Sequence, residues 1–330
     1  MTQRKWIAVF LAVLMVAAAL AGCSGEKKAA EGNGSGENAR KVAMITNDTI
    51  NDGGWNAACY AGMCEAAKEY GFETSYTEKV AESDYASTFT EYANMGFDLI
   101  FAPGNEYTDA VLEVAPNFPD VNFVVLNGEI SGDNYSSIKC DNVQMGFLAG
   151  VLAGLKTKTG NIGYVGAIEI TTALDNISGF EQGAAYVNPD TKVHVAWTNS
   201  WTDTAKGKEV AISMITTNDV DVFYGNAGTI DVGVREAAKQ YEERYAVAQP
   251  AESLDQDPDI ILNSVITDNA ALIGMAMKAV AEGSFGNSIY EGGVAEGVLS
   301  IGKFGTNAED IKDDFNKIYE DLKAGNIELK

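Results

Sequence analysis

Short apolar runs alternate with amphipathic stretches along most of the chain. The apolar runs hold four to eight residues and are bounded by turn-forming residues, which is the pattern of buried strands. Helical patterns follow most of them, for example at Trp55–Tyr70 and Thr229–Tyr241. The predicted strands are Lys41–Thr46, Asp98–Pro103, Asn122–Gly128, Asn161–Ala167, Lys192–Thr198, Asp221–Ala227, Tyr245–Ala248 and Ile260–Thr267.

Near-continuous apolar strands that alternate with helices indicate parallel sheets covered on both faces. The chain has 330 residues, and the part after the first 39 is too long for one small core. The pattern therefore predicts an α/β protein with two doubly wound, Rossmann-like lobes joined by a multi-strand hinge. We expect an N-terminal lobe of 40–128 plus about 250–284, and a C-terminal lobe of about 129–249 plus 285–330.

The first 39 residues have a different composition. Arg4 and Lys5 precede an apolar run that ends in Leu20-Ala21-Gly22-Cys23. A basic start, a short apolar core and small residues before a cleavage site are typical of a secretion signal, and the run is short for a membrane span. The last four residues match the bacterial lipobox, which predicts a signal peptide over 1–22 and acylation (palmitate included) of Cys23. An ordinary cleaved signal is the alternative, and the polar composition of 23–39 predicts a flexible tether.

The formal net charge of the chain is −24. Such a surface repels nucleic acid and anionic lipid, so we expect no nucleic-acid partner and attachment to the membrane through the lipid alone. His194 is the only histidine and lies in a predicted strand, which disfavours His-based metal or triad chemistry. Cys59, Cys64 and Cys140 allow at most one disulfide, with packed free thiols as the alternative, and Cys59 and Cys64 make a poor metal pair. We expect neither a metal nor a cofactor.

Ligands of parallel α/β sheets bind beyond the carboxyl ends of the strands. The residues that follow the predicted strands are rich in amides, carboxylates and aromatic rings, which suits an uncharged, flat or polyhydroxylated ligand better than a phosphate. Gly225–Thr229 lacks the lysine of a phosphate loop. Capping of the next helix is an alternative role for Asp48 and Asp52. Packing is the alternative for Trp55, Trp201 and Tyr107.

Several short segments follow one another in a characteristic order between about residues 41 and 305. They include Ile50-Asn51-Asp52, Trp55-Asn56, Tyr60-Ala61-Gly62, Pro119–Phe123, Gly146–Gly150, Gly163–Gly166, Gly179–Gly183 and Ser200–Asp203. Their order and spacing resemble the basic membrane protein family of ABC-transporter lipoproteins, whose best-known type is a purine nucleoside receptor. The resemblance implies a type I periplasmic-binding-protein fold and a non-enzymatic receptor that works with ABC permease subunits at the extracytoplasmic face of the cell membrane.

The resemblance also implies that a purine ring lies between two aromatic side chains, here Trp55 and Trp201. Members of this family hold the ribose with acidic residues and a lysine. At the positions of the acids this chain has Asn47, Asn127 and the Gln249-Pro250 pair, and at the position of the lysine it has Thr267. An amide offers one acceptor and one donor group where a carboxylate accepts two hydroxyls, so the sugar contacts are expected to be altered. A different ring, such as a flavin, is therefore an alternative ligand.

Two other functions are alternatives to transport. A ligand-sensing lipoprotein would have the same sequence features, whereas a nucleoside hydrolase would need a carboxylate cluster that the strand ends lack. We therefore expect no catalytic residues. The predicted ligand-binding residues are Asn47, Asp48, Asp52, Trp55, Asn56, Tyr107, Asn127, Trp201, Asn226, Gly228, Asp231 and Gln249.

Overall fold

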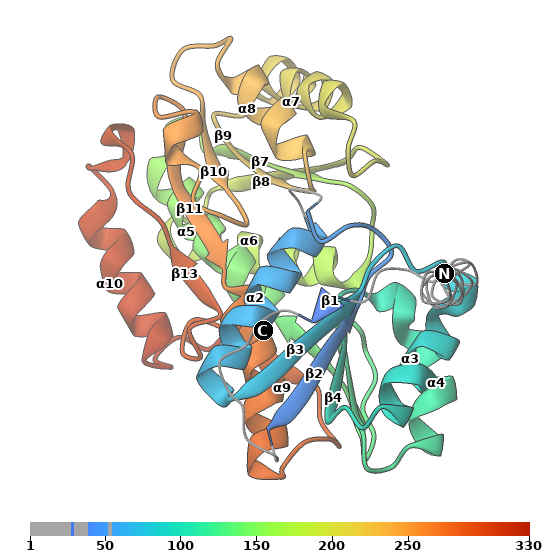
Figure 1. Ribbon diagram of the computed structural model, residues 1–330. Helices are drawn as coiled ribbons and strands as arrows, with labels where there is room; N and C mark the ends of the chain where they lie inside the picture. Colours follow the sequence, from blue (N-terminus) through green and yellow to red (C-terminus); the bar gives the residue numbers. More distant parts are fainter. Residues whose placement is uncertain (1–27, 30–38, 52–54) are drawn as a thin grey trace, which may run out of the picture.

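The computed structural model describes residues 28–29, 39–51 and 55–330, so Cys23 and Asp52 lie outside the described residues. Two sheets each form the centre of one lobe (Figure 1). The first contains, in spatial order, β1 (Lys28–Ala29), β3 (Phe72–Thr77), β2 (Arg40–Ile45), β4 (Leu99–Ala102), β5 (Asn122–Leu126), β6 (Tyr135–Cys140) and β12 (Tyr290–Gly292). The second contains β13 (Leu299–Ile301), β11 (Ile261–Thr267), β10 (Tyr245–Ala248), β9 (Val222–Asn226), β7 (Asn161–Gly166) and β8 (Lys192–Trp197).

Pairing within both sheets is parallel except at β1–β3 and β11–β13. All eight predicted strands are confirmed to within two residues at either end. Five strands were not predicted, namely β1, β3, β6, β12 and β13. β1, β12 and β13 are edge strands of two or three residues, and β3 and β6 lie next to an edge and carry several polar residues. Their sequences therefore lack the apolar run that marks the central strands.

Side chains of the N-terminal lobe alternate across its sheet, as the period of a strand requires. Val42 and Met44 face α2 (Trp55–Tyr70) and α9 (Asn269–Glu282) in one apolar cluster. Ala43 and Ile45 face the other side, where they pack with α3 (Tyr85–Asn94) and α4 (Thr108–Val114). The sheet is therefore covered on both faces, as the apolar runs predicted.

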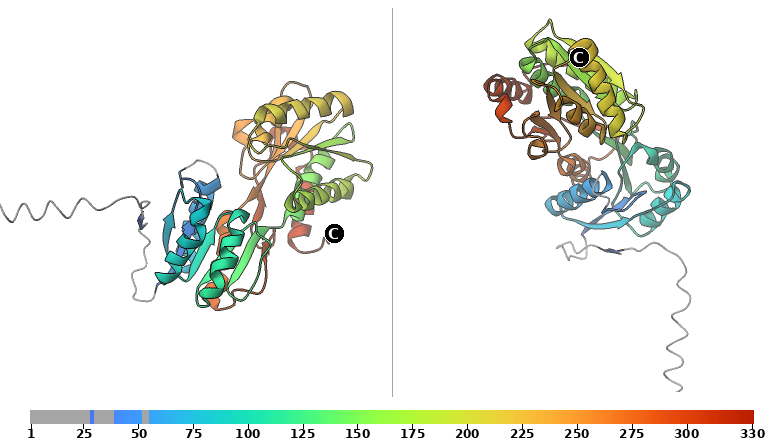
Figure 2. Two further views of the ribbon diagram at one scale, coloured as in Figure 1. Left: turned by 90° about the vertical axis from the view of Figure 1, so that its right-hand side faces the viewer. Right: turned by 90° about the horizontal axis from the view of Figure 1, so that it is seen from above.

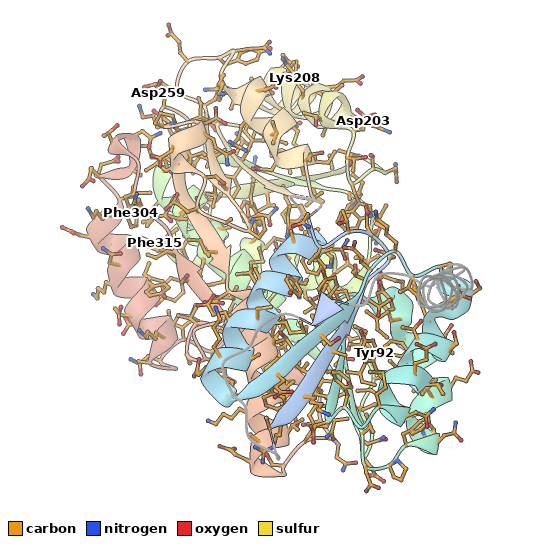
Figure 3. All side chains as sticks on the ribbon, in the orientation of Figure 1. Tyr92, Asp203, Lys208, Asp259, Phe304 and Phe315 are labelled. Atoms are coloured by element: carbon orange, nitrogen blue, oxygen red, sulfur yellow. The ribbon has the colours of Figure 1, made fainter. Side chains whose placement is uncertain are left out.

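The C-terminal lobe has the same three layers. Tyr164 and Val247 pack with α5 (Asn142–Lys156), α6 (Thr171–Val187) and α10 (Lys312–Lys323). Val165 and Phe223 pack with α7 (Thr204–Asn218) and α8 (Ile230–Ala238) on the opposite face. On the outer side of this lobe, Phe315 of α10 lies against Phe304, with ring centroids 5.7 Å apart (Figure 3).

Glycines bring α5 and α6 into backbone contact. Gly146 and Gly150 face Asn176 and Phe180 of α6, while Gly179 and Gly183 of α6 face the α5 backbone. A Cβ on any of these glycines would overlap the backbone of the other helix. Close packing of this kind leaves no room for a side chain at the interface.

The chain passes between the two sheets three times in its described part (Figure 2). β6 leads to α5, β11 leads to α9, and β12 leads through residues 293–298 to β13. The Asp141 amide donates to the Gly292 carbonyl at 2.8 Å, and the Asp268 amide donates to the Val298 carbonyl at 2.8 Å. The third crossing therefore lies between the other two and is hydrogen-bonded to both.

Strand pairing divides the chain differently from the segments predicted for the lobes. β6 and β12, expected in the C-terminal lobe, pair with each other and extend the first sheet. β11, expected in the N-terminal lobe, lies in the second sheet beside β10. The physical reason is that each sheet is completed by strands that return after a crossing, and a local apolar pattern does not reveal a strand's partner.

The α5–α6 contact predicts the effect of one added methyl group. Gly150→Ala should lower the free energy of unfolding by about 1–3 kcal/mol, because the new Cβ forces the two helix backbones apart. Urea unfolding followed by circular dichroism would measure the change. Glu181→Ala, on the exposed side of α6, is the control, and equal stability of Gly150→Ala and the control would contradict the prediction.

Candidate functional site

Two neighbouring residues attach the first turn of α2 to the ends of two strands. The Thr46 hydroxyl, just after β2, donates to Asn56 Oδ1. Trp55 Nε1 donates to the carbonyl of Pro103, just after β4, at 2.5 Å. The indole N–H is therefore used within the protein, while 46% of Trp55 stays exposed. Trp55 is thus held in place with part of its apolar surface open to solvent.

Asn47 lies at the end of β2 and is exposed. Its Nδ2 donates to Glu106 Oε1 at 3.4 Å. Glu106 was not predicted as a site residue, although it follows a predicted strand and directly precedes Tyr107, which was. The structure therefore places a carboxylate beside Asn47, one of the positions where the family resemblance implied an acid.

Local contacts shape the loop between β2 and α2. The Asp48 side chain accepts from the Thr49 amide at 2.7 Å. Glu78, which follows β3, accepts from the Thr49 hydroxyl at 3.1 Å and from the Ile50 amide at 3.0 Å. Asp48 therefore supports this loop, and its partner is the amide of the next residue. Glu78 was not anticipated, because β3 itself was not predicted.

Asn127 and Tyr107 differ in their access to the strand ends. Asn127 is exposed after β5, has a φ of 59°, and donates its amide to the Ile138 carbonyl at 2.8 Å. Asparagine tolerates this left-handed conformation better than most residues. Tyr107 is fully buried, with its ring centroid 4.3 Å from that of Tyr85, and burial raises the pKa of its phenol. Its position is that of a packing residue.

In the C-terminal lobe, Trp201 lies in the loop after β8 and is also 46% exposed. Its carbonyl accepts from the Thr229 amide at 3.2 Å. Gly228 has a φ of +43°, and a Cβ there would overlap the Trp201 carbonyl oxygen. Only glycine suits this close approach, which holds the β8 and β9 loops together. Asp203 then begins α7 by accepting from the Lys206 amide at 3.0 Å (Figure 3).

The ends of β9 and β10 are joined by a side-chain amide. Gln249 Nε2, after β10, donates to the Gly225 carbonyl in β9 at 3.1 Å. Asn226, the last residue of β9, is partly exposed at the same edge. Both residues therefore reach the carboxyl end of the second sheet, and Gln249 also holds two strand ends in register.

Asp231, predicted to contact the ligand, is instead 3% exposed and belongs to an ion-pair network. Arg235 Nε donates to Asp231 Oδ2 at 2.9 Å, and the same guanidinium pairs with Asp257. Burial raises the pKa of Asp231 to about 6, although the Arg235 charge acts in the opposite direction. The network connects α8 to Asp257, in the segment between β10 and β11, so Asp231 has a structural role.

The described residues contain no cluster of three or more His, Cys, Asp or Glu side chains suited to a metal. His194 lies on β8 as predicted, with Nε2 3.0 Å from Asn161 Oδ1. Cys59, Cys64 and Cys140 form no disulfide with one another. In the same described part of the chain, no helix combines the length and apolar character that a membrane span requires.

Two parallel α/β lobes joined by three crossings are the architecture of type I solute-binding proteins, and this chain has that architecture. A comparison of the sequence with models of known protein families agrees with this architecture. Residues 39–330 match the model of the PnrA-like ABC transporter substrate-binding proteins, and the chain belongs to this family. Proteins of this class act outside the cytoplasm and deliver a bound small molecule to a permease.

Individual relatives cover most of the chain. It is 29% identical to the ABC transporter nucleoside-binding protein BmpA of Lactococcus lactis subsp. cremoris, over 98% of both chains. It is 28% identical to a purine-binding protein of Brucella abortus, over 87% of this chain and 82% of that one. A crystal structure of a transcriptional activator of the comK gene from Bacillus halodurans covers 87% of this chain and 99% of that one, with a TM-score of 0.76 and 24% identity.

The buried Asp231 predicts a pH dependence of stability. Its folded-state pKa of about 6 lies above that of an unfolded aspartate, about 3.9, so its contribution to the free energy of unfolding falls as the pH rises from about 4 to about 6. The difference in unfolding free energy between wild type and Asp231→Asn should therefore fall by up to about 3 kcal/mol over this range and stay constant above it. Urea unfolding at pH 4, 5, 6 and 7 would measure it. A difference that rises with pH would mean that the Arg235 charge outweighs burial.

Proposed function

We propose that this protein is the receptor of an ABC importer for an uncharged heteroaromatic solute, namely a purine nucleoside or nucleobase. The observation that carries the proposal is the matched pair of indoles. Trp55 and Trp201 lie after strand ends in different lobes, and each is 46% exposed. Closure of the lobes on a flat ring would cover both.

Stacking suits such a ring for energetic reasons. A tryptophan that covers a heterocycle removes apolar area from water and adds roughly 0.5–1.5 kcal/mol of geometry-dependent contact. The protein already positions the Trp55 indole through its Nε1 hydrogen bond, whereas the hydrogen bond of the Trp201 carbonyl fixes the backbone of the Trp201 loop. Little conformational entropy of the Trp55 side chain is then lost when the ring binds.

Side-chain amides at the strand ends suit the edges of a base. Asn47, Asn127 and Asn226 lie at the ends of β2, β5 and β9. Each amide both donates and accepts, which matches the mixed donors and acceptors of a nucleobase. Glu106, 3.4 Å from Asn47, supplies one carboxylate that a ribose hydroxyl could use. The ring is therefore proposed to supply more of the affinity than the sugar.

A sensing role is the second candidate. The solved structure with a TM-score of 0.76 is named as a transcriptional activator, so this fold also occurs in a protein named for regulation rather than transport. A different ring, such as a flavin, would suit the same pair of indoles. Neither alternative changes the assignment of the chain to a two-lobed solute-binding protein.

The lipobox motif supports attachment to the membrane. We infer that cleavage before Cys23 and acylation of its thiol anchor the protein at the extracytoplasmic face of the cell membrane. Among the polar residues that follow, Lys28–Ala29 pair with β3 at the edge of the first sheet. The other residues of 24–39 would then act as the tether between the anchor and the N-terminal lobe.

Removal of either indole should weaken binding of the ring. Trp55→Ala and Trp201→Ala should each raise the Kd by roughly 30-fold or more, since loss of a central aromatic contact costs about 2 kcal/mol or more. Calorimetry with adenine, adenosine, guanosine and riboflavin would identify the ring and measure the change. The control is Tyr186→Ala, because Tyr186 is also a large exposed aromatic residue (53%) but lies in the last turn of α6, away from the strand ends. Unchanged affinity for the ring in both tryptophan variants would contradict the proposal.

Lipidation depends on a single thiol in this scheme. Cys23→Ser should leave the precursor uncleaved by lipoprotein signal peptidase and without fatty acid, because serine offers no thiol for the diacylglyceryl group. Metabolic labelling with palmitate and intact-mass measurement would detect this. Normal acylation of the serine variant would contradict it.

A further inference from the structure

Three large aliphatic side chains are exposed at the carboxyl end of β7. Ile168, Ile170 and Leu174 are 37%, 39% and 46% exposed. None of them belongs to the four apolar clusters that form the cores of the two lobes, either as a buried member or as a partly buried neighbour. The cores therefore do not account for their apolar character. We call these three residues the aliphatic wall.

The aliphatic wall adjoins the loop that carries Trp201. The Thr198 amide donates to the Gly166 carbonyl at 2.9 Å, and the Asn199 amide donates to the Ala167 carbonyl at 2.7 Å. The β7 and β8 loops thus run side by side just before Ile168 and Trp201. Leu174 lies one helical turn after Ile170, and its amide donates to the Ile170 carbonyl at 3.0 Å.

Exposed apolar side chains gathered at one place commonly mark a binding surface. Here they lie beside the proposed ring site, at the sheet edge where ligands of parallel α/β proteins bind. The edges of a bare purine carry nitrogen and N–H groups, which would lose their hydrogen bonds to water against aliphatic carbon. An edge that bears alkyl groups gains from the same contact.

We propose that the aliphatic wall binds an alkyl-bearing edge of the ring, and that the solute is therefore an alkylated heterocycle. This inference rests on the proposed function, since it assumes that a ring lies between the two indoles. Each alkyl carbon that becomes buried should tighten binding by about fourfold, which corresponds to ~0.8 kcal/mol. The indoles would determine that a ring binds, and the wall would determine which ring binds best.

Matched ligands test the proposal on the full-length wild-type protein. The probes are adenine with its N6- and N9-methyl, ethyl and propyl derivatives, and alloxazine with its 7,8-dimethyl derivative, all measured by calorimetry. At least one series should gain about fourfold in affinity per carbon over its first two carbons. No gain in any series would overturn the proposal, and this outcome needs no variant protein.

Substitutions then locate the gain. Ile168→Ser, Ile170→Ser and Leu174→Ser should abolish the alkyl gain and leave the affinity for the unsubstituted ring within about twofold. Val195→Ser is the matched control, because Val195 is 38% exposed on the edge strand β8 and precedes the strand end. Equal weakening of substituted and unsubstituted rings would show that the wall serves lobe closure instead, and would overturn the proposal.

The outcomes separate this inference from the proposed function. A ring whose binding depends on Trp55 and Trp201 but not on its alkyl groups would leave the proposed function standing and refute the wall. Failure of every heterocycle to bind, with and without alkyl groups, would refute both.

Discussion

The hydrogen bonds between the three crossing segments are the contacts on which the rest of the structure depends. The Gly292 carbonyl accepts from the Asp141 amide, and the Val298 carbonyl accepts from the Asp268 amide, each at 2.8 Å. They hold three short segments side by side between two sheets that each have their own core. Because the connections are few and short, each lobe can move as a unit, and residues of two lobes can meet on one ligand only through this hinge.

Two of the crossings share a local design. Each passes from a strand of one lobe to a helix of the other, and an aspartate marks the change. Asp141 accepts from the Gln144 amide at 2.8 Å and caps α5, while Asp268 accepts from the Ala270 amide at 2.8 Å and caps α9. Gln144 also accepts from the Val294 amide at 3.0 Å, so the cap of α5 reaches the third crossing. Capping and hinge contacts are thus made by the same residues.

The sequence predicts well what depends on neighbours along the chain. Central strands such as β4 and β10 are near-continuous apolar runs, and strand ends identified Trp55, Trp201 and Asn127 as accessible residues. It predicts poorly what depends on partners far away. The segment that forms β6 was placed in the wrong lobe, because nothing in its sequence specifies that it pairs with β5 and β12. Asp231 was expected to face the ligand because the pattern of an acid after a strand does not show that Arg235 covers it.

Polar and apolar groups at the strand ends differ in how far folding satisfies them. Folding satisfies some of the polar atoms there: Trp55 Nε1 donates to Pro103, the Trp201 carbonyl accepts from Thr229, and Gln249 donates to Gly225. It leaves the indole rings and the aliphatic wall partly in water. Their burial must then come from lobe closure and a solute that fits, because no other element of the described chain covers them in this conformation. A site that presents exposed indole and aliphatic surface beside a few side-chain amides selects for a ring whose faces and substituents can cover carbon.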